Sequence, residues 1–372
     1  MPEIDRNTFI PVYKPLIGAR ERRYVDECLK TGWISSRGRF VGEFEKSFAE
    51  FLGANHTIAV CNGTVALHLA MLALGIGRGD EVIVPTLTYV SSVNAVKYVD
   101  ATPVFADSHP EYWGIDPARI EENITPKTKA IVAVHLYGHP CDMDPIMEIA
   151  KQHDLFVIED AAEAHGAEYK GRRAGNFGKV NTFSFYGNKI ITTGEGGMVV
   201  TDSDSLSNLC RRLRGQGVVA ENTYWHDILG YNYRMSNVAA AIGLAQLERA
   251  NETLARKRTI AEVYIGELGS VDGVVLQAEA PWARNVYWMF SILVSPKQRE
   301  PLREYLAQEM VETRPFFSPV HMMPMYSEHE NRNLPVAQDL AVRGINLPSG
   351  PTLTDAEVRR VCHLVRQYLT RR

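Results

Sequence analysis

Short apolar segments alternate with segments of helical pattern over residues 58–201, and this alternation limits the fold more than any other feature of the sequence. The apolar segments are dense in Val and Ile, as expected for strands that are buried on both faces. The pattern therefore predicts an α/β fold in which a large domain contains a mostly parallel mixed sheet. The expected strands are 57–60, 81–85, 103–107, 130–136, 155–160, 181–185 and 197–201, and the helices between them include 63–74 and 143–153.

The pattern changes after Ser236, which is a suitable N-cap residue for a long helix. Apolar residues such as Ala241 and Ala245 fall on one face of that helix, which is expected to continue to about Arg256. We therefore expect two domains, a large one at residues 1–250 and a small one at 251–372.

The small domain is expected to be an α+β unit. Its expected strands are 286–294 and 311–314, with a helix at 300–308. A further helix at 19–30, near the start of the chain, can pack with this small domain.

The composition excludes several classes of protein. The hydrophobic fraction is 45% and the charged fraction 23%, as in ordinary globular proteins. A net charge of −4 with dispersed basic residues gives no nucleic-acid or membrane surface. The five cysteines contain no CxxC pair, and the first residues lack the apolar core of a signal peptide, so we expect reduced thiols in the cytoplasm.

Lys189 is the candidate catalytic residue. It lies in a Ser/Gly-rich turn after an expected strand, and the apolar strand 155–160 ends in an acid, Asp160. A pyridoxal 5′-phosphate (PLP) enzyme needs this pair, because the lysine forms a Schiff base with the cofactor aldehyde and the carboxylate keeps the pyridine nitrogen protonated.

Candidate phosphate-binding residues lie at two other strand ends. Gly63 and Thr64 lie at a strand-to-helix junction, where helix N–H groups attract anions. Ser184 lies at a strand end five residues before Lys189. Each of these residues, taken alone, also fits a plain turn, helix cap or strand end.

Two further residues are expected near the same cofactor. Glu163 follows Asp160 by three residues and would reach the cofactor's hydroxyl or imine nitrogen from the same helical face. Tyr89 follows a strand end and can stack on the pyridine ring. The carboxyl ends of such strands gather ligands at one edge of the sheet, so the joint order of these residues favours one site.

Two other motifs are only weak indications of a different kind of site, one for a dinucleotide and one for a metal. The glycines at 75–79 precede a strand and do not have the GxGxxG spacing of a dinucleotide site. His135 and His139 lie in a turn with Gly and Pro, so helical metal-ligand geometry is not expected, and we interpret the segment as packing near the site. No metal is expected.

The chain resembles the DegT/DnrJ/EryC1/StrS sugar aminotransferases, which are fold-type I PLP enzymes, over nearly its whole length. The segments that carry the resemblance are 62–64, 85–89, 159–163, 187–190, 192–197 and 230–235. The resemblance implies that Lys189 forms the Schiff base, that Asp160 pairs with the ring nitrogen, and that Glu163 stands where many members have Gln. It also implies phosphate contacts from Gly63, Thr64 and Ser184, and a ring contact from Tyr89.

The resemblance also implies an assembly and a reaction. Asn232 would reach the phosphate in a neighbouring subunit, which implies a homodimer with shared sites. Segments around Trp33, Arg314 and His321 resemble members that aminate C4 of GDP-4-keto-6-deoxy-D-mannose to GDP-perosamine, with L-glutamate as donor and pyridoxamine phosphate as the intermediate cofactor form. These three residues are then the candidate contacts to the nucleotide sugar.

Three alternatives remain open at this point. The first is an aminotransferase for a dTDP- or UDP-linked keto sugar. The second is a PLP-dependent sugar dehydratase, which Lys189 disfavours because such relatives carry His at that position. The third is a non-catalytic PLP-binding regulator, which would be expected to lack part of the cofactor set.

Overall fold

The central element of the fold is a seven-stranded sheet with the strand order β1-β9-β8-β5-β4-β2-β3. The computed structural model describes residues 8–219, 222–329 and 332–370. Only β9 runs antiparallel to its neighbours, and the other neighbouring pairs are parallel, so the mostly parallel mixed sheet is confirmed. The strands are β1 (His56–Val60), β2 (Glu81–Pro85), β3 (Thr102–Ala106), β4 (Thr128–Val134), β5 (Phe156–Asp160), β8 (Val180–Ser184) and β9 (Gly197–Thr201).

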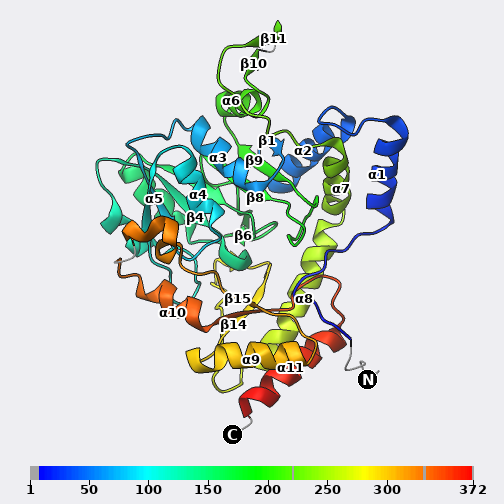
Figure 1. Cartoon of the computed structure of the whole chain (residues 1–372), viewed down its shortest axis with the longest axis vertical. Helices are drawn as coiled ribbons and strands as arrows, with labels where there is room; N and C mark the ends of the chain where they lie inside the picture. The colour runs from blue at the N-terminus through cyan, green and yellow to red at the C-terminus, as the bar shows by residue number, and fades with distance from the viewer. Residues whose placement is uncertain (1–7, 220–221, 330–331, 371–372) are drawn as a thin grey trace.

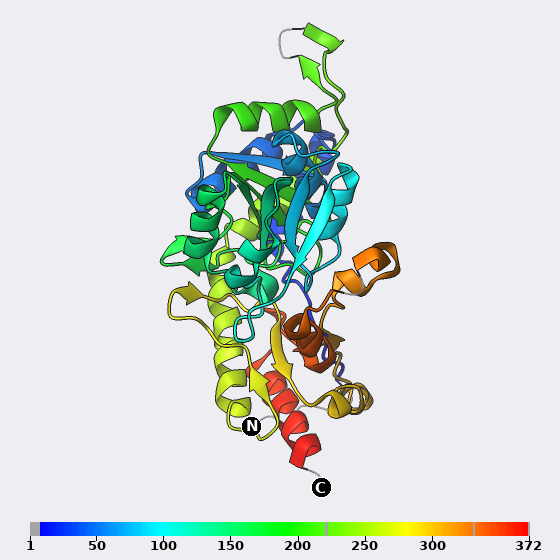
Figure 2. The ribbon, with the colours of Figure 1, turned by 90° about the vertical axis from the view of Figure 1, so that its left-hand side faces the viewer.

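Helices cover both faces of this sheet (Figures 1 and 2). Successive residues of a strand point to opposite faces, and the core follows that alternation: Met198 and Val200 pack in one hydrophobic cluster and Val199 in another. The helices around the sheet are α1 (Ala19–Thr31), α2 (Arg39–Leu52), α3 (Gly63–Ala73), α4 (Ser91–Tyr98), α5 (Met143–Gln152), α6 (Asp204–Arg214) and α7 (Asn237–Leu247).

The long helix expected after Ser236 is two helices, so that prediction was wrong. Ser236 does cap α7, its hydroxyl accepting the N–H of Ala239 at 3.2 Å. A second helix, α8 (Ala250–Leu268), begins after Arg249, whose φ of −113° and ψ of 9° leave the helical path. The Arg249 guanidinium pairs with Glu21 of α1 at 2.7 Å, so the residue at the break contacts a distant part of the chain.

A smaller unit packs against α8 at the C-terminal end of the molecule (Figure 1). Its antiparallel sheet has the order β12-β14-β16-β15. The strand expected at 286–294 is shorter, and the one expected at 311–314 begins later. The elements are β12 (Val275–Leu276), β14 (Phe290–Leu293), β15 (Arg314–Pro315), β16 (Gly344–Leu347), α9 (Pro296–Gln308), α10 (Pro335–Arg343) and α11 (Asp355–Thr370).

The first described residues join this smaller unit. Ile10 is fully buried in its core, and its N–H donates to the carbonyl of Met310 at 2.8 Å. The N–H of Ser349 in turn donates to Val12 at 2.8 Å. The helix that follows, α1, packs along α7 instead of on the smaller unit, so residues before α1 make the contact that was expected of the helix. The domain division at residue 250 stays a prediction.

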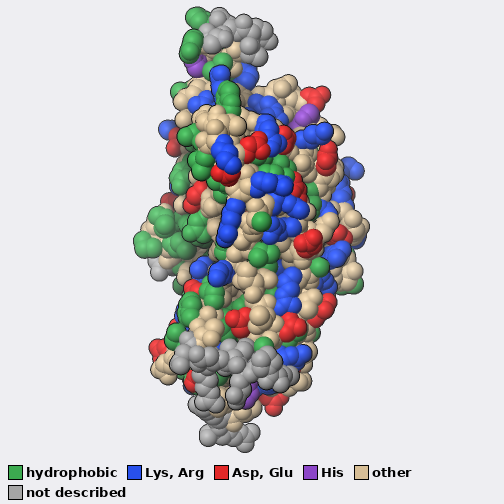
Figure 3. All heavy atoms as spheres, turned by 90° about the vertical axis from the view of Figure 1, so that its right-hand side faces the viewer, with side chains coloured by type: hydrophobic (Ala, Val, Ile, Leu, Met, Phe, Trp, Pro, Cys, Tyr) green, Lys and Arg blue, Asp and Glu red, His purple; other side chains and the backbone are tan. Residues whose placement is uncertain are grey.

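A hairpin of β10 (Val218–Val219) and β11 (Asn222–His226) projects from the end opposite the C-terminus (Figures 1 and 2). It exposes Tyr224 and Trp225. On the face that carries α1, Lys and Arg side chains are interspersed with Asp and Glu (Figure 3). Among the described residues, every helix is too short or too polar for a membrane span.

Three short strands complete the described fold beside the main sheet. They are β6 (Glu168–Tyr169), β7 (Arg172–Arg173) and β13 (Ala283–Arg284), and they pair in the order β13-β6-β7. The pairing of β13 with β6 connects the segment before β14 to the large sheet region.

Candidate active site

A cavity of about 750 Å³ opens at the carboxyl ends of the parallel strands. Seven of the predicted cofactor-binding residues line it together, although they come from distant parts of the sequence. They are Gly63, Thr64, Tyr89, Asp160, Glu163, Ser184 and Lys189. The sheet brings them to one edge for the reason expected from the sequence, because ligand sites form where parallel strands end.

One end of the cavity is a tight junction between the start of α3 and the end of β8. A Cβ added at Gly63 would lie 2.7 Å from the Cβ of Ser184, so any other residue there would force one of the two segments to shift. The Asn62 side chain caps α3 by accepting the N–H of Val65 at 2.9 Å. The preceding N–H groups, those of Gly63 and Thr64, have no partner within the helix and can bind an anion.

Asp160 lies at the end of β5 and is 4% exposed. One carboxylate oxygen accepts the hydroxyl of Ser92 at 2.7 Å, and the other accepts the N–H of Ala162 at 3.1 Å. The hydroxyl of Thr88 lies 3.1 Å from that of Ser92, so a short chain of hydroxyl groups orients the carboxylate. Sequence reasoning did not identify Ser92.

Lys189 and Glu163 form the centre of the cavity. The lysine Nζ lies 3.6 Å from Oε1 of Glu163, and Oε2 accepts the N–H of Tyr137 at 2.8 Å. Burial raises the pKa of Glu163 to about 7, against the opposing charge of Lys189. Burial lowers the pKa of Lys189, against the opposing charges of Glu163 and Asp160. Both groups are thereby shifted toward their neutral forms, which suits proton exchange near neutral pH.

The segment after Asp160 is a pair of turns and not the helix that was expected to carry Glu163. Glu163 reaches the site because its carboxylate is tied to the backbone of Tyr137, in the turn after β4. His165, two residues on, is fully buried between Phe183 and Phe185.

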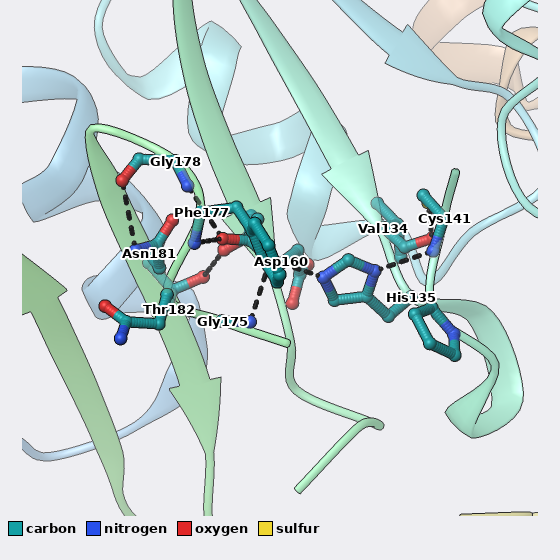
Figure 4. Close-up of polar contacts among 12 residues, drawn as sticks. Val134, His135, Cys141, Asp160, Gly175, Phe177, Gly178, Asn181 and Thr182 are labelled. Atoms are coloured by element: carbon teal, nitrogen blue, oxygen red, sulfur yellow. Dashed lines mark hydrogen bonds and ion pairs between the residues drawn. The ribbon is translucent and has the colours of Figure 1, made fainter. Parts of the chain in front are cut away.

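Glu159, which precedes Asp160 on β5, is fully buried and accepts several hydrogen bonds. Its carboxylate accepts hydrogen bonds from His135 Nε2 at 2.8 Å and from the N–H groups of Gly175 and Gly178, each at 2.8 Å. The neighbourhood is shown in Figure 4. Because the N–H of Cys141 points to Nδ1 of His135, the imidazole proton sits on Nε2. Burial opposes ionisation of Glu159, but these donors hold its pKa below the ordinary value.

The three residues predicted to contact the substrate lie in different places in the structure. Arg314 lines the cavity mouth with half of its side chain exposed, 3.7 Å from Glu312. His321 is fully buried away from the cavity, with Nδ1 2.6 Å from the hydroxyl of Thr86. Trp33 is exposed and lies outside the cavity lining. Of the three, only Arg314 is brought to the site in this chain.

Asn232 also lies outside the cavity. It is exposed and pairs through its backbone with Gly215 beside the β10–β11 hairpin. Trp288, in contrast, lines the cavity and was missed, because nothing in a Trp within an expected strand indicates that its ring meets a lysine about 100 residues away. Within the described residues, no cluster of His, Cys, Asp and Glu is arranged to hold a metal ion.

Comparisons with known proteins agree with this geometry. The model of the DegT/DnrJ/EryC1/StrS aminotransferase family matches residues 15–366. The GDP-perosamine synthase of Escherichia coli O157:H7 is 54% identical over 97% of this chain and 98% of its own length. The GDP-perosamine synthase of Vibrio cholerae is 47% identical over 96% of this chain and 99% of its own.

Solved structures show the same fold. The aminotransferase TlmJ of Streptoalloteichus hindustanus superimposes with a TM-score of 0.93 at 31% identity, covering 97% of this chain and 99% of that one. Spr1654 of Streptococcus pneumoniae, solved in a PLP form, gives 0.92 at 26% identity over 97% of this chain and 99% of its own.

The cavity fits the PLP that this family implies. The cradle at Gly63, which a Cβ would fill, and the first N–H groups of α3 suit a phosphate. Asp160 offers a carboxylate to a protonated ring nitrogen, and Lys189 offers an amine to an aldehyde. The half-exposed ring of Tyr89 lies at the same cavity. The donor set therefore matches the phosphate, ring nitrogen and aldehyde of this cofactor.

Proposed function

The chain belongs to the DegT/DnrJ/EryC1/StrS aminotransferase family, and from that membership we propose that it transfers the amino group of L-glutamate to C4 of GDP-4-keto-6-deoxy-D-mannose, giving GDP-perosamine. The observation that carries the choice of sugar is the identity of 47–54%, over nearly the whole length, with three relatives named GDP-perosamine synthase. The five free cysteines fit an enzyme of the cytoplasm.

The residues divide the work of the reaction among them. When bound, PLP supplies an aldehyde that takes up an amino group and a ring that accepts electrons from the donor's α-carbon. The N–H groups of Gly63 and Thr64, with the Ser184 hydroxyl, would hold the phosphate. Asp160 would hold the proton on the ring nitrogen, because a buried carboxylate is stabilised by a facing cation.

Lys189 is proposed to hold the cofactor between turnovers and to move protons during them. Its Nζ, in the cavity beside Glu163, would take the proton from the α-carbon of glutamate. Glu163 lies 3.6 Å away and can share that proton because burial raises its pKa to about 7. For the keto sugar, the same groups would act in the reverse order.

The active enzyme is proposed to be a homodimer with shared sites. Asn232 is exposed and lies outside the cavity of its own chain, as expected of a residue that serves a partner's phosphate. Arg314, at the cavity mouth, is proposed to contact the nucleotide sugar.

The test is a panel of GDP-, dTDP- and UDP-linked 4-keto-6-deoxy sugars with glutamate, read by mass spectrometry. We expect an aminated product from the GDP sugar alone. Turnover only of a dTDP or UDP sugar would refute the choice of substrate, and a deoxy product without nitrogen would refute aminotransfer.

Lys189→Ala tests the catalytic assignment. We expect loss of both turnover and the visible absorbance of bound cofactor. The matched control is Lys179→Ala, an exposed lysine immediately before the other end of β8, which should leave both unchanged. Wild-type turnover in the Lys189 variant would rule out its assigned role.

A further inference from the structure

Trp288 places the face of its indole ring against the amine of Lys189. The lysine Nζ lies 3.7 Å from the ring centroid, and the tryptophan is only 5% exposed. A cation over an aromatic face within about 6 Å is attracted by the ring, and the attraction grows when water is excluded. The protonated amine therefore has two stabilising neighbours, the carboxylate of Glu163 and this ring.

Several contacts fix Trp288 in that position. Its Nε1 donates to the carbonyl of Asn188 at 2.7 Å, so the indole is tied to the residue directly before Lys189. The ring also stacks on Tyr137, with centroids 6.3 Å apart. A Cβ added at Gly138 would lie 2.8 Å from the backbone nitrogen of Trp288, so the two segments are in close contact.

Lys257 of α8 contacts the backbone of the same tryptophan. Its side chain is 1% exposed, and its Nζ donates to the carbonyls of Trp288, at 3.0 Å, and Ser349. Among the described residues, it forms no ion pair with a carboxylate. Burying an amine without a carboxylate is costly, so the two carbonyls and the Tyr13 ring around Lys257 must offset that cost.

A second route connects Lys257 to the active lysine. Its Nζ lies 5.2 Å from the centroid of the Tyr13 ring. The hydroxyl of Tyr13 donates to the backbone carbonyl of Lys189 at 3.1 Å. Lys257 thus contacts both residues, Trp288 and Tyr13, that hold the side chain and the backbone of Lys189.

We propose that Trp288 holds the protonated amine of Lys189 beside Glu163 whenever that lysine is not bonded to the cofactor, and that Lys257 is a positioning residue that keeps Trp288 in place. The inference rests on the proposed function, because it assumes that Lys189 alternates between bonded and free forms. Without such a hold, a four-carbon side chain could swing within a cavity of about 750 Å³.

The charged groups around the two lysines are few. Lys189 faces Glu163 and feels the charge of Asp160, and the neighbouring imidazole of His165 has its pKa lowered to about 3 by burial and then by Lys189. Lys257 faces the two carbonyls and the Tyr13 ring, and burial lowers its pKa to about 7. Because indole does not titrate, replacing Trp288 removes no titrating group. A shift of the pH profile of Lys189 in a Trp288 variant therefore reports the loss of the ring itself.

The experiment measures how fast cofactor-free protein takes up added PLP as a function of pH, from the growth of the visible absorbance. Removing the ring in Trp288→Leu should destabilise the ammonium form and move the midpoint of the profile to lower pH. On the rising limb, the rate should increase roughly fivefold. Trp288→Phe keeps an aromatic face and should move the midpoint less. A Trp288→Leu midpoint equal to that of wild type would overturn the proposal, whatever happens to the plateau.

Lys257→Met, which keeps the length of the side chain without its charge, tests the positioning role. We expect its midpoint to move in the same direction as that of Trp288→Leu. The matched control is Arg256→Met, on the same helix, whose guanidinium contacts Asp355 and Leu353 but not Trp288. A Lys257 variant that is less stable to urea but has an unmoved midpoint would show a purely structural role and refute this part.

A separate variant, Lys189→Ala, tests the proposed function itself. Lys189→Ala should give no absorbance growth at any pH. Growth in that variant would show that Lys189 is not the attachment point, whereas an unmoved midpoint in Trp288→Leu leaves that assignment intact.

Discussion

Gly63→Ala tests the phosphate cradle most directly. The added methyl carbon would lie 2.7 Å from the Cβ and 3.2 Å from the Cα of Ser184. Carbon atoms in ordinary contact are about 3.5–4.0 Å apart, so Ser184 or the start of α3 must retreat by roughly 1 Å. Ser184 cannot move freely, because it pairs with Gly197 in the sheet.

Two effects oppose each other in this variant. Alanine is the better helix former by about 1 kcal/mol at an unhindered helical site, which alone would stabilise the protein. Overpacking of a tight junction costs about 1–3 kcal/mol. We therefore expect a net loss of up to about 2 kcal/mol in the free energy of unfolding. Displacement of the cradle should also remove about one charge-assisted hydrogen bond and weaken PLP binding by about tenfold to a hundredfold.

The assays are urea unfolding of the cofactor-free protein and equilibrium titration with PLP. Gly187→Ala is the matched control, because its Cβ would meet only the carbonyl oxygen of Gly194 at 3.9 Å, an ordinary contact. It should leave both quantities unchanged. A Gly63 variant as stable as wild type, with unchanged PLP affinity, would refute the argument that this junction is the cradle.

Three further predictions follow from other groups. Burial raises the pKa of Glu163 to about 7, so the carboxyl loses its proton at a lower pH in the unfolded chain than in the folded one. The unfolding free energy of the cofactor-free protein should therefore fall by about 3 kcal/mol as the pH rises from 4.5 to 7, and Glu163→Gln should flatten that fall. Glu159→Gln should cost about 3 kcal/mol or more in urea unfolding at neutral pH, because an amide cannot accept all the donors around Glu159; a loss below 1 kcal/mol would contradict the anchoring role. Arg314→Ala should raise KM for the GDP sugar about tenfold with kcat nearly unchanged, and an unchanged KM would remove Arg314 from the substrate site.

The strands and the cofactor-binding edge were predictable because their causes are local. The apolar run ending at Asp160 reads as a buried strand, a further strand ends at Ser184, and the parallel arrangement then brings their ends together. Gly63 could be singled out because a strand-to-helix junction next to a phosphate leaves no room for a Cβ.

The remaining features depend on contacts between distant residues. The break between α7 and α8 lies at Arg249, whose side chain pairs with Glu21, 228 residues away. His321 was expected at the substrate, but a hydrogen bond to Thr86, 235 residues away, holds it in the core. Trp288 and Lys257 act through a ring face and a backbone carbonyl, neither of which leaves a motif in the sequence.

The docking of Ile10 beside Val311 has a consequence for synthesis on the ribosome. The N–H of Val12 donates to the carboxylate of Glu312, 300 residues later in the chain. At about 5–20 residues per second, roughly 15–60 s pass before that partner is made. During translation, Ile10 and Val12 must therefore wait without these partners while the large sheet assembles. A late step of maturation is then the docking of Ile10 and Val12, and an N-terminal fusion partner that hinders this docking should slow the appearance of active enzyme without altering its final stability.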